Sequence, residues 1–263
     1  MQRFKNKVCI ISGGASGIGA KTAEIFTEQG GKVLIGDIDE KNGENQTNKI
    51  IEKFGNGTAI FSYLDVSNPD DCEKAVEKAV NEFGSVDFLL NSAIKMAPGM
   101  LKELSLQDWN TMITIGLTGT FLMTQATGRW MIENDTPGSI VTMSSIGGQQ
   151  PYGMSGAYST VKAAVIMLAE HFGIEWASHK IRVNAICPGH TETPLTSYLK
   201  DSNIKKQRSE ITPLLRVAQP IDIANGILFL FSEEADYITA TTLEIDGGLS
   251  KTVMNHLPGR KWK

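Results

Sequence analysis

Short apolar runs alternate with helix-like segments along almost the whole 263-residue sequence. We expect seven of these runs to be strands, at residues 7–12, 32–37, 58–65, 86–91, 139–144, 182–187 and 242–246. The segments with helical period or length are residues 18–30, 40–54, 69–83, 107–133, 156–178 and 220–232. This alternation is typical of βαβ units around a parallel sheet. Because most of the runs are continuously apolar, we expect helices on both faces of the sheet, in a doubly wound α/β fold of about seven strands.

No linker, repeat or low-complexity stretch divides the chain, so we predict one domain over residues 1–263. The three cysteines are an odd number without C-x-x-C spacing, which argues against a disulfide framework and a zinc site. No apolar run approaches the ~18 residues of a membrane span, and residues 8–11 are too few for a signal-peptide core. We expect a cytoplasmic protein with no metal and no membrane contact.

The charge balance narrows the class of partner. Lys and Arg number 25 against 29 Asp and Glu, which gives a net charge of -4. Nucleic-acid binding depends on clustered basic residues, and the sequence lacks such clusters. We therefore expect small-molecule partners and no nucleic acid.

A glycine-rich loop stands where the first strand turns into the first helix. Gly13, Gly17 and Gly19 form the pattern G-x-x-x-G-x-G, with Ser16 and Ile18 between them. Glycine there permits a sharp turn, a close approach to a pyrophosphate and tight packing of helix on strand. The helix N-terminus adds free N–H donors and a partial positive charge. The loop predicts a dinucleotide cofactor.

Asp37 ends the second predicted strand at about the spacing expected for the carboxylate that binds an adenosine ribose. Its charge would repel a 2′-phosphate, which favours NAD over NADP. The alternative is that Asp37 only caps the next helix, but Asp39 is placed as well or better for that task. Ile38 follows in the same turn, and Asp65 with Val66 gives a weaker signal for adenine contact at the end of the third strand.

Tyr158 and Lys162 stand at i and i+4 near the start of a predicted helix, so their side chains share one face. A tyrosine with the ordinary pKa of ~10 can act as a base near neutrality only if nearby positive charge lowers that pKa by roughly 3. Lys162 and an oxidised nicotinamide could together do so. Ser145 follows a strand upstream and is a candidate donor to the substrate oxygen.

With these motifs, the chain resembles the short-chain dehydrogenase/reductase family, in its compact single-domain Rossmann branch, over essentially its full length. The motifs that carry the resemblance further are Asn91-Ser92-Ala93, Arg182-Val183-Asn184, residues 188–193, residues 220–224 and Ile245-Asp246-Gly247-Gly248.

The resemblance implies a role for each matching residue. Tyr158 would be the general acid/base, Ser145 would position the carbonyl or alkoxide, and Lys162 would lower the pKa of Tyr158 and bond the nicotinamide ribose. Asn91 would lie near the adenosine ribose. The nicotinamide carboxamide would contact the segment 188–193, with Pro188, Gly189, Thr191 and Thr193. The family also implies a homotetramer, or less often a dimer, built on the two most apolar helices.

Two positions depart from the family pattern. Ile94 stands where the family usually has a glycine that admits the cofactor, and Gly116 replaces the asparagine to which a water-mediated proton relay is attributed. Gly116 could reflect drift at a tolerant position, or it could admit a water or a closer backbone approach.

Two segments are expected to surround the substrate: residues 146–155 as a wall and residues 191–215 as a lid. Residues 249–263 are expected to form a C-terminal tail. In the lid, Leu195, Tyr198 and Leu199 either face the substrate or pack as ordinary helix residues. Nearby, Lys205, Lys206 and Arg208 either attract an anionic substrate or form a solvated face.

The sequence thus predicts an NAD-dependent oxidoreductase that moves a hydride between nicotinamide and a neutral, partly apolar secondary alcohol or ketone. Two alternatives remain. One is an NADPH-dependent 3-oxoacyl-thioester reductase, and the other is a catalytically impaired NAD-binding regulatory protein.

Overall fold

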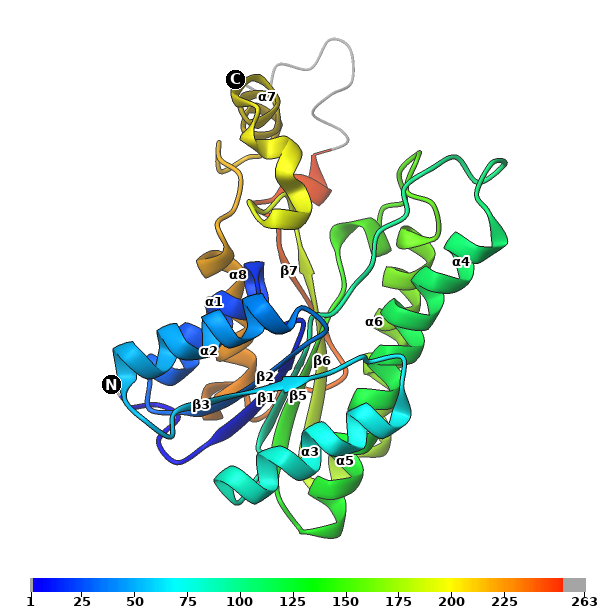
Figure 1. Ribbon diagram of the computed structural model, residues 1–263. Coiled ribbons are helices and arrows are strands. Elements are labelled where there is room, and N and C mark those ends of the chain that lie inside the picture. Colours follow the sequence, from blue (N-terminus) through cyan, green and yellow to red (C-terminus); the bar gives the residue numbers. More distant parts are fainter. Residues whose placement is uncertain (1, 253–263) are drawn as a thin grey trace.

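A seven-stranded parallel sheet forms the centre of the molecule in a computed structural model that describes residues 2–252 (Figure 1). The strand order is β3-β2-β1-β4-β5-β6-β7. The strands are β1 Val8–Ser12, β2 Lys32–Asp37, β3 Ala59–Tyr63, β4 Phe88–Asn91, β5 Gly138–Met143, β6 Ile181–Pro188 and β7 Thr242–Ile245. The predicted doubly wound α/β fold is confirmed, although β3 and β4 are shorter than the sequence indicated.

Helices cover both faces of the sheet (Figure 1). On one face lie α1 Gly17–Glu28, α2 Glu40–Phe54 and α8 Pro220–Phe231. On the other lie α3 Pro69–Phe83, α5 Gly119–Glu133 and α6 Tyr158–Glu175. Burial on both faces explains why the strands read as continuous apolar runs.

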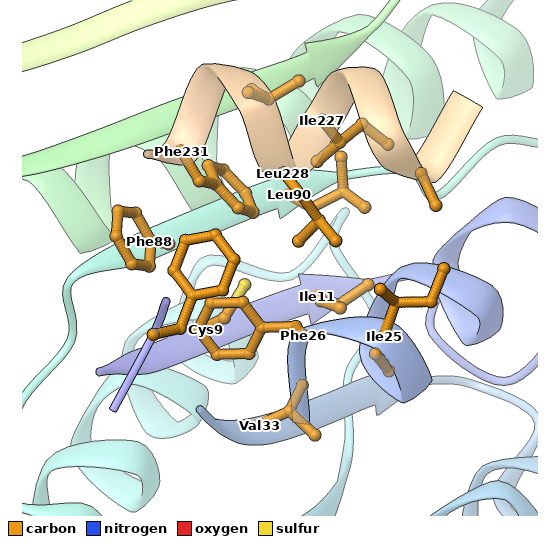
Figure 2. Packing of buried hydrophobic residues seen from close by; sticks show 14 of the residues in the cluster. Cys9, Ile11, Ile25, Phe26, Val33, Phe88, Leu90, Ile227, Leu228 and Phe231 are labelled. Carbon is orange, nitrogen blue, oxygen red and sulfur yellow. The ribbon is translucent and has the colours of Figure 1, made fainter. Parts of the chain in front are cut away.

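Aromatic packing holds α1 and α8 against the middle of the sheet (Figure 2). The ring centroids of Phe26 and Phe88 lie 5.8 Å apart with the rings edge to face, and those of Phe88 and Phe231 lie 4.9 Å apart in a stack. Such pairs add about 0.5–1.5 kcal/mol each beyond their burial. This packing fixes α1, whose N-terminus begins directly after the glycine loop.

The order of the strands creates a crevice at one edge of the sheet. In the ladder, Cys9 of β1 pairs with Val33 of β2 on one side and with Phe88 of β4 on the other. The chain therefore leaves β1 toward one side for β2 and β3, and toward the other side for β4 to β7. In open α/β sheets, ligands bind at the carboxyl ends of the strands at such a switch point.

The predicted helix 107–133 is in fact three pieces. They are α4 Leu106–Ile113, a π-helical turn Thr114–Thr118 and α5. The lid contains a helix that the sequence did not indicate, α7 Ser202–Ile211, after a short 3-10 segment Pro194–Lys200. The predicted tail begins as the 3-10 turn Leu249–Lys251, and its residues 253–263 lie outside the described residues. Within residues 2–252, none of the helices combines the length and apolar character needed to cross a membrane.

Candidate active site

A cavity of about 540 Å³ opens at the carboxyl ends of the strands, over the switch point. Nearly all of the predicted site residues line it: Gly13, Ser16, Gly17, Ile18, Asp37, Ile38, Asp65, Val66, Ser145, Tyr158, Lys162, Pro188, Gly189, Thr191 and Thr193. Gly19 and Asn91 are not among the lining residues. The sequence did not single out five further residues that line the cavity. Leu64, Met143 and Ser144 stand at strand ends, and Pro194 and Thr196 belong to the predicted lid.

The glycine loop is crowded, and its crowding explains its composition. A Cβ on Gly13 would lie 2.7 Å from the Ala93 backbone nitrogen, and one on Gly19 would lie 2.3 Å from the Gly13 carbonyl oxygen. Gly13 also has a φ of 74°, which disfavours side chains. Gly19 is therefore a packing residue behind the loop, whereas Gly13 and Gly17 face the cavity.

The N-terminus of α1 is open toward the cavity. Ser16 is its N-cap residue, but its side chain makes no capping hydrogen bond within the described chain, and no acidic residue stands in the first turn. The first N–H groups of a helix lack partners inside the helix, so they are available to phosphate oxygens. This end of the cavity fits the pyrophosphate of a dinucleotide.

Asp37 lines the cavity and also supports the glycine loop. Its Oδ2 accepts a hydrogen bond from the Ala15 backbone N–H at 3.0 Å, and its Oδ1 accepts one from the Asp39 N–H at 3.0 Å. The cap of α2 is Asp39, whose Oδ1 accepts from the Asn42 N–H at 3.1 Å. Asp37 is therefore not the helix cap.

Asn91 is buried at the end of β4 and is not among the residues that line the cavity, and its place near the adenosine ribose stays a prediction. Its side chain is 4% exposed, and its Nδ2 donates to Thr124 Oγ1 at 2.8 Å. This bond joins the end of β4 to α5. The carbonyl Oδ1 of Asn91 is buried and has no hydrogen-bond partner among the described residues.

Tyr158, Lys162 and Ser145 come together at the other end of the cavity. Tyr158 is the first residue of α6, and Lys162 follows one turn later, with its Nζ 5.8 Å from the centroid of the Tyr158 ring. The Lys162 ammonium is buried and donates to the Met143 carbonyl oxygen at 2.5 Å. Ser145 Oγ accepts from the Gly147 N–H at 3.0 Å, which leaves the hydroxyl proton available to another acceptor.

Burial shifts the pKa values of Tyr158 and Lys162 so that the neutral form of each side chain is favoured. It raises the pKa of Tyr158 to about 12, and the hydrogen bond from Ser145 offsets only part of this. Burial lowers the pKa of Lys162 to about 8. Desolvation of the phenolate is the largest cause of the raised pKa of Tyr158. The expectation that Lys162 and an oxidised nicotinamide together lower this pKa stays a prediction.

The two departures from the family pattern touch each other. Gly116 lies in the π-helical turn, where a Cβ would lie 2.9 Å from Ile94 Cδ1 and 2.6 Å from Val161 Cγ1. The Ile94 and Val161 side chains thus fill the space that a side chain at position 116 would need. The glycine thus leaves the space that these two side chains occupy.

This contact predicts a coupled effect on stability. Gly116→Ala is expected to lower the free energy of unfolding by about 1–3 kcal/mol through overpacking. At a helix position with free space, the same change from glycine to alanine would instead raise the free energy of unfolding by about 1 kcal/mol. Ile94→Ala in the same chain should recover part of the loss. Chemical denaturation measures both, with Gly99→Ala as the control because nothing in residues 2–252 lies within 4 Å of a Cβ there. Equal stability of Gly116→Ala and the parent would contradict the packing argument.

The lid is tied to the segment after β6 by two polar contacts. Arg208 Nη1 lies 3.0 Å from His190 Nε2, and Lys205 Nζ lies 2.7 Å from Glu192 Oε2. Burial and the Arg208 charge lower the pKa of His190 to about 4, so this ring is neutral near pH 7. Lys205 is therefore in an ion pair and not a free charge for an anionic substrate.

The three candidate substrate residues of the lid separate in the structure. Leu195 lines the cavity, whereas Tyr198 is 44% exposed and is not among the lining residues. Leu199 is 1% exposed, so it packs inside the protein and does not face a substrate.

Comparison with known proteins gives full-length matches. A family model described as enoyl-(acyl carrier protein) reductase matches residues 13–250. A 2,5-dichloro-2,5-cyclohexadiene-1,4-diol dehydrogenase from Sphingobium indicum is 39% identical over 248 residues, which are 94% of this chain and 98% of that protein. A 3-oxoacyl-[acyl-carrier-protein] reductase from Thermotoga maritima is 38% identical over 250 residues, which are 94% of this chain and 99% of that protein.

Among solved structures, the crystal structure of levodione reductase superimposes with a TM-score of 0.88 at 27% identity. The match covers 95% of this chain and 99% of that one.

Proposed function

The chain belongs to the short-chain dehydrogenase/reductase family, and we propose that it oxidises a neutral secondary alcohol to a ketone with NAD, using Tyr158 as the general base. The observation that carries this proposal is one cavity lined by Ser145, Tyr158 and Lys162 at one end and by the glycine loop with Asp37 at the other.

The residues present fit a nicotinamide dinucleotide. The uncapped N-terminus of α1 would bind the pyrophosphate, Asp37 the adenosine ribose, and Lys162 the nicotinamide ribose. Thr191 and Thr193 line the wall that would face the carboxamide. When bound, the cofactor supplies a hydride acceptor at C4 of its nicotinamide ring.

The proton of the alcohol goes to this chain's own residues. Ser145 would hold the substrate oxygen by hydrogen bonding, and Tyr158 Oη would accept the hydroxyl proton as the carbon loses its hydride. Since burial raises the pKa of Tyr158 to about 12, the phenolate needs nearby positive charge to form. The protonated Lys162 ammonium, one turn away and 5.8 Å from the centroid of the Tyr158 ring, would supply that charge.

The lining of the cavity favours a neutral, partly apolar substrate. Its apolar side chains include Ile94, Ile115 and Leu195, and among the described residues no Arg lines it. The similarity to a cyclohexadiene diol dehydrogenase supports a substrate whose hydroxyl group is on a six-membered carbocycle. A second candidate, reduction of a 3-oxoacyl thioester, is favoured by the 38% identical reductase.

The test is turnover by the purified protein with isopropanol, cyclohexanol, cyclohexane diols and a 3-oxoacyl thioester, with NAD or NADP and their reduced forms. We expect NADH from the cyclic alcohols and little reaction with NADP. Thioester reduction that prefers NADPH would support the second candidate. NAD binding without turnover of any substrate would overturn the proposal in favour of a regulatory NAD-binding protein.

The cofactor preference should depend on the charge of Asp37. Asp37→Asn keeps an acceptor for the Ala15 N–H and removes the charge that would repel a 2′-phosphate. Since a like charge at close range costs several kcal/mol, the ratio of kcat/KM for NAD to that for NADP should fall by about 10- to 100-fold. Asp39→Asn, two residues away on the α2 cap, is the matched control and should leave the ratio unchanged. An unchanged ratio in Asp37→Asn would show that another group selects the cofactor.

We also infer a cytoplasmic homotetramer. Phe121 on α5 and Met167 and Ile174 on α6 are apolar and 36%, 54% and 70% exposed. A second copy of the chain would bury these faces. Size-exclusion chromatography with light scattering measures the oligomeric state.

A further inference from the structure

Gly147 stands between three side chains, and two of them, Ser145 and Tyr158, line the cavity. A Cβ on Gly147 would lie 2.9 Å from Tyr152 Cε1, 3.4 Å from Ser145 Oγ and 3.4 Å from Tyr158 Cε1. Its φ lies outside the left-handed region, so its backbone conformation admits other residues. The glycine is needed for space and not for conformation.

The backbone at Gly147 has no room to retreat. Its N–H donates to Ser145 Oγ at 3.0 Å, and it lies in the 3-10 turn Ile146–Gly148. The next residue, Gly148, packs so closely on α6 that a Cβ there would lie 2.7 Å from the Lys162 carbonyl carbon. A side chain added at Gly147 must therefore displace its one movable neighbour, the Tyr152 ring.

Tyr152 is held by packing alone. Its ring is 51% exposed, and its hydroxyl makes no hydrogen bond within residues 2–252. The centroid of the ring lies 6.4 Å from that of Tyr158, with the planes inclined by 60°. Tyr198 of the lid is near enough to raise the pKa of both phenols. Two tyrosines, Tyr152 and Tyr158, thus meet around Gly147 next to Ser145.

We propose that Gly147, by leaving room for the Tyr152 ring next to Ser145 and Tyr158, creates an aromatic wall that selects cyclic secondary alcohols over small acyclic ones. The inference rests on the proposed alcohol oxidation. A carbocycle whose hydroxyl group reaches Ser145 and Tyr158 extends far enough to pack on the Tyr152 face, whereas isopropanol does not. Contact with an aromatic face is favourable for an apolar ring.

The test compares kcat/KM for cyclohexanol with that for isopropanol in Gly147→Ala. A methyl group at Gly147 would remain in ordinary contact with Ser145 and Tyr158 but would displace Tyr152. We expect the cyclohexanol value to fall about tenfold and the isopropanol value to change less than about twofold. Gly153→Ala is the matched control, since nothing in the described part of the chain lies within 4 Å of a Cβ there, and it should match the parent.

A double variant distinguishes this mechanism from general damage. Tyr152→Ala should show the same selective loss, and Gly147→Ala with Tyr152→Ala should lose no more than either single variant, because both remove the same wall. Tyr152→Phe should keep the parent's selectivity. If Gly147→Ala does not fold, the exposed Tyr152 variants carry the test alone.

Additive losses in the double variant, or equal losses for both alcohols, would overturn the proposal. A parent protein that oxidises neither alcohol would instead overturn the proposed function. The two failures are therefore distinguishable by the parent's activity.

Discussion

Tyr158→Phe is expected to lower kcat for alcohol oxidation by about 10³-fold, within the range that positioned acid/base groups contribute. The substitution removes only the Oη atom and keeps the ring, which packs against the buried cluster of Met112, Val161 and Val165. The affinity for NAD should therefore change little. Steady-state kinetics and isothermal titration calorimetry measure the two quantities separately.

Tyr152→Phe is the matched control for that loss. It removes a phenol hydroxyl from the ring whose centroid is 6.4 Å from that of Tyr158, and it should retain nearly the parent's kcat. If Tyr158→Phe behaved like this control, the proton would have to leave through another group, and the assigned base would be wrong.

The pH profile gives an independent check on the same residue. The pKa of Tyr158 is raised to about 12, and the phenolate is the reactive form, so kcat/KM for oxidation should rise with pH in the parent. The reverse reaction needs the protonated phenol and should not rise. Lys162, with a pKa of about 8, loses its charge in the unliganded protein above that pH, so the rise should flatten there. Tyr158→Phe should lose the rise.

The strands and the cofactor loop could be predicted because local physics determines them. Strands buried on both faces need continuous apolar runs, and the turn after β1 needs glycine at Gly13, where φ is 74°. The assignment of Asp37 to the cavity and Asp39 to the cap of α2 also followed from spacing, and the hydrogen bonds agree.

The π-helical turn Thr114–Thr118 could not be predicted from the apolar pattern. The apolar period through residues 107–133 is that of one helix, and a single i→i+5 turn changes it little. The close contact of Gly116 with Ile94 and Val161 joins residues that are distant in the sequence. Ile94 and Gly116 each departed from the family pattern, but only the coordinates show that they touch.

The lid helix α7 was missed because its sequence has no apolar pattern. None of its residues, Ser202–Ile211, is buried, so no apolar stripe marks it in the sequence. The burial that raises the pKa of Tyr158 cannot be read from the i, i+4 spacing of Tyr158 and Lys162.

Gly19→Ala should abolish most cofactor binding although Gly19 does not line the cavity. The alanine Cβ would lie 2.3 Å from the Gly13 carbonyl oxygen, which is much closer than the van der Waals contact distance of two non-bonded atoms. Gly13 has no room to yield, because it already packs on the backbone of Ala93. The start of α1 must then move away from β1, and its N–H groups with it.

The loss of two charge-assisted hydrogen bonds to phosphate, at about 1.5–3 kcal/mol each, corresponds to a fall in NAD affinity of about 100-fold or more. Isothermal titration calorimetry measures it, and circular dichroism verifies that the sheet has formed. Gly99→Ala, where a Cβ meets nothing within 4 Å in residues 2–252, should bind like the parent. Parent-like affinity in a folded Gly19→Ala protein would mean that the N-terminus of α1 does not bind the pyrophosphate. In that case the cofactor would have to be held mainly by Asp37 and the residues around Tyr158.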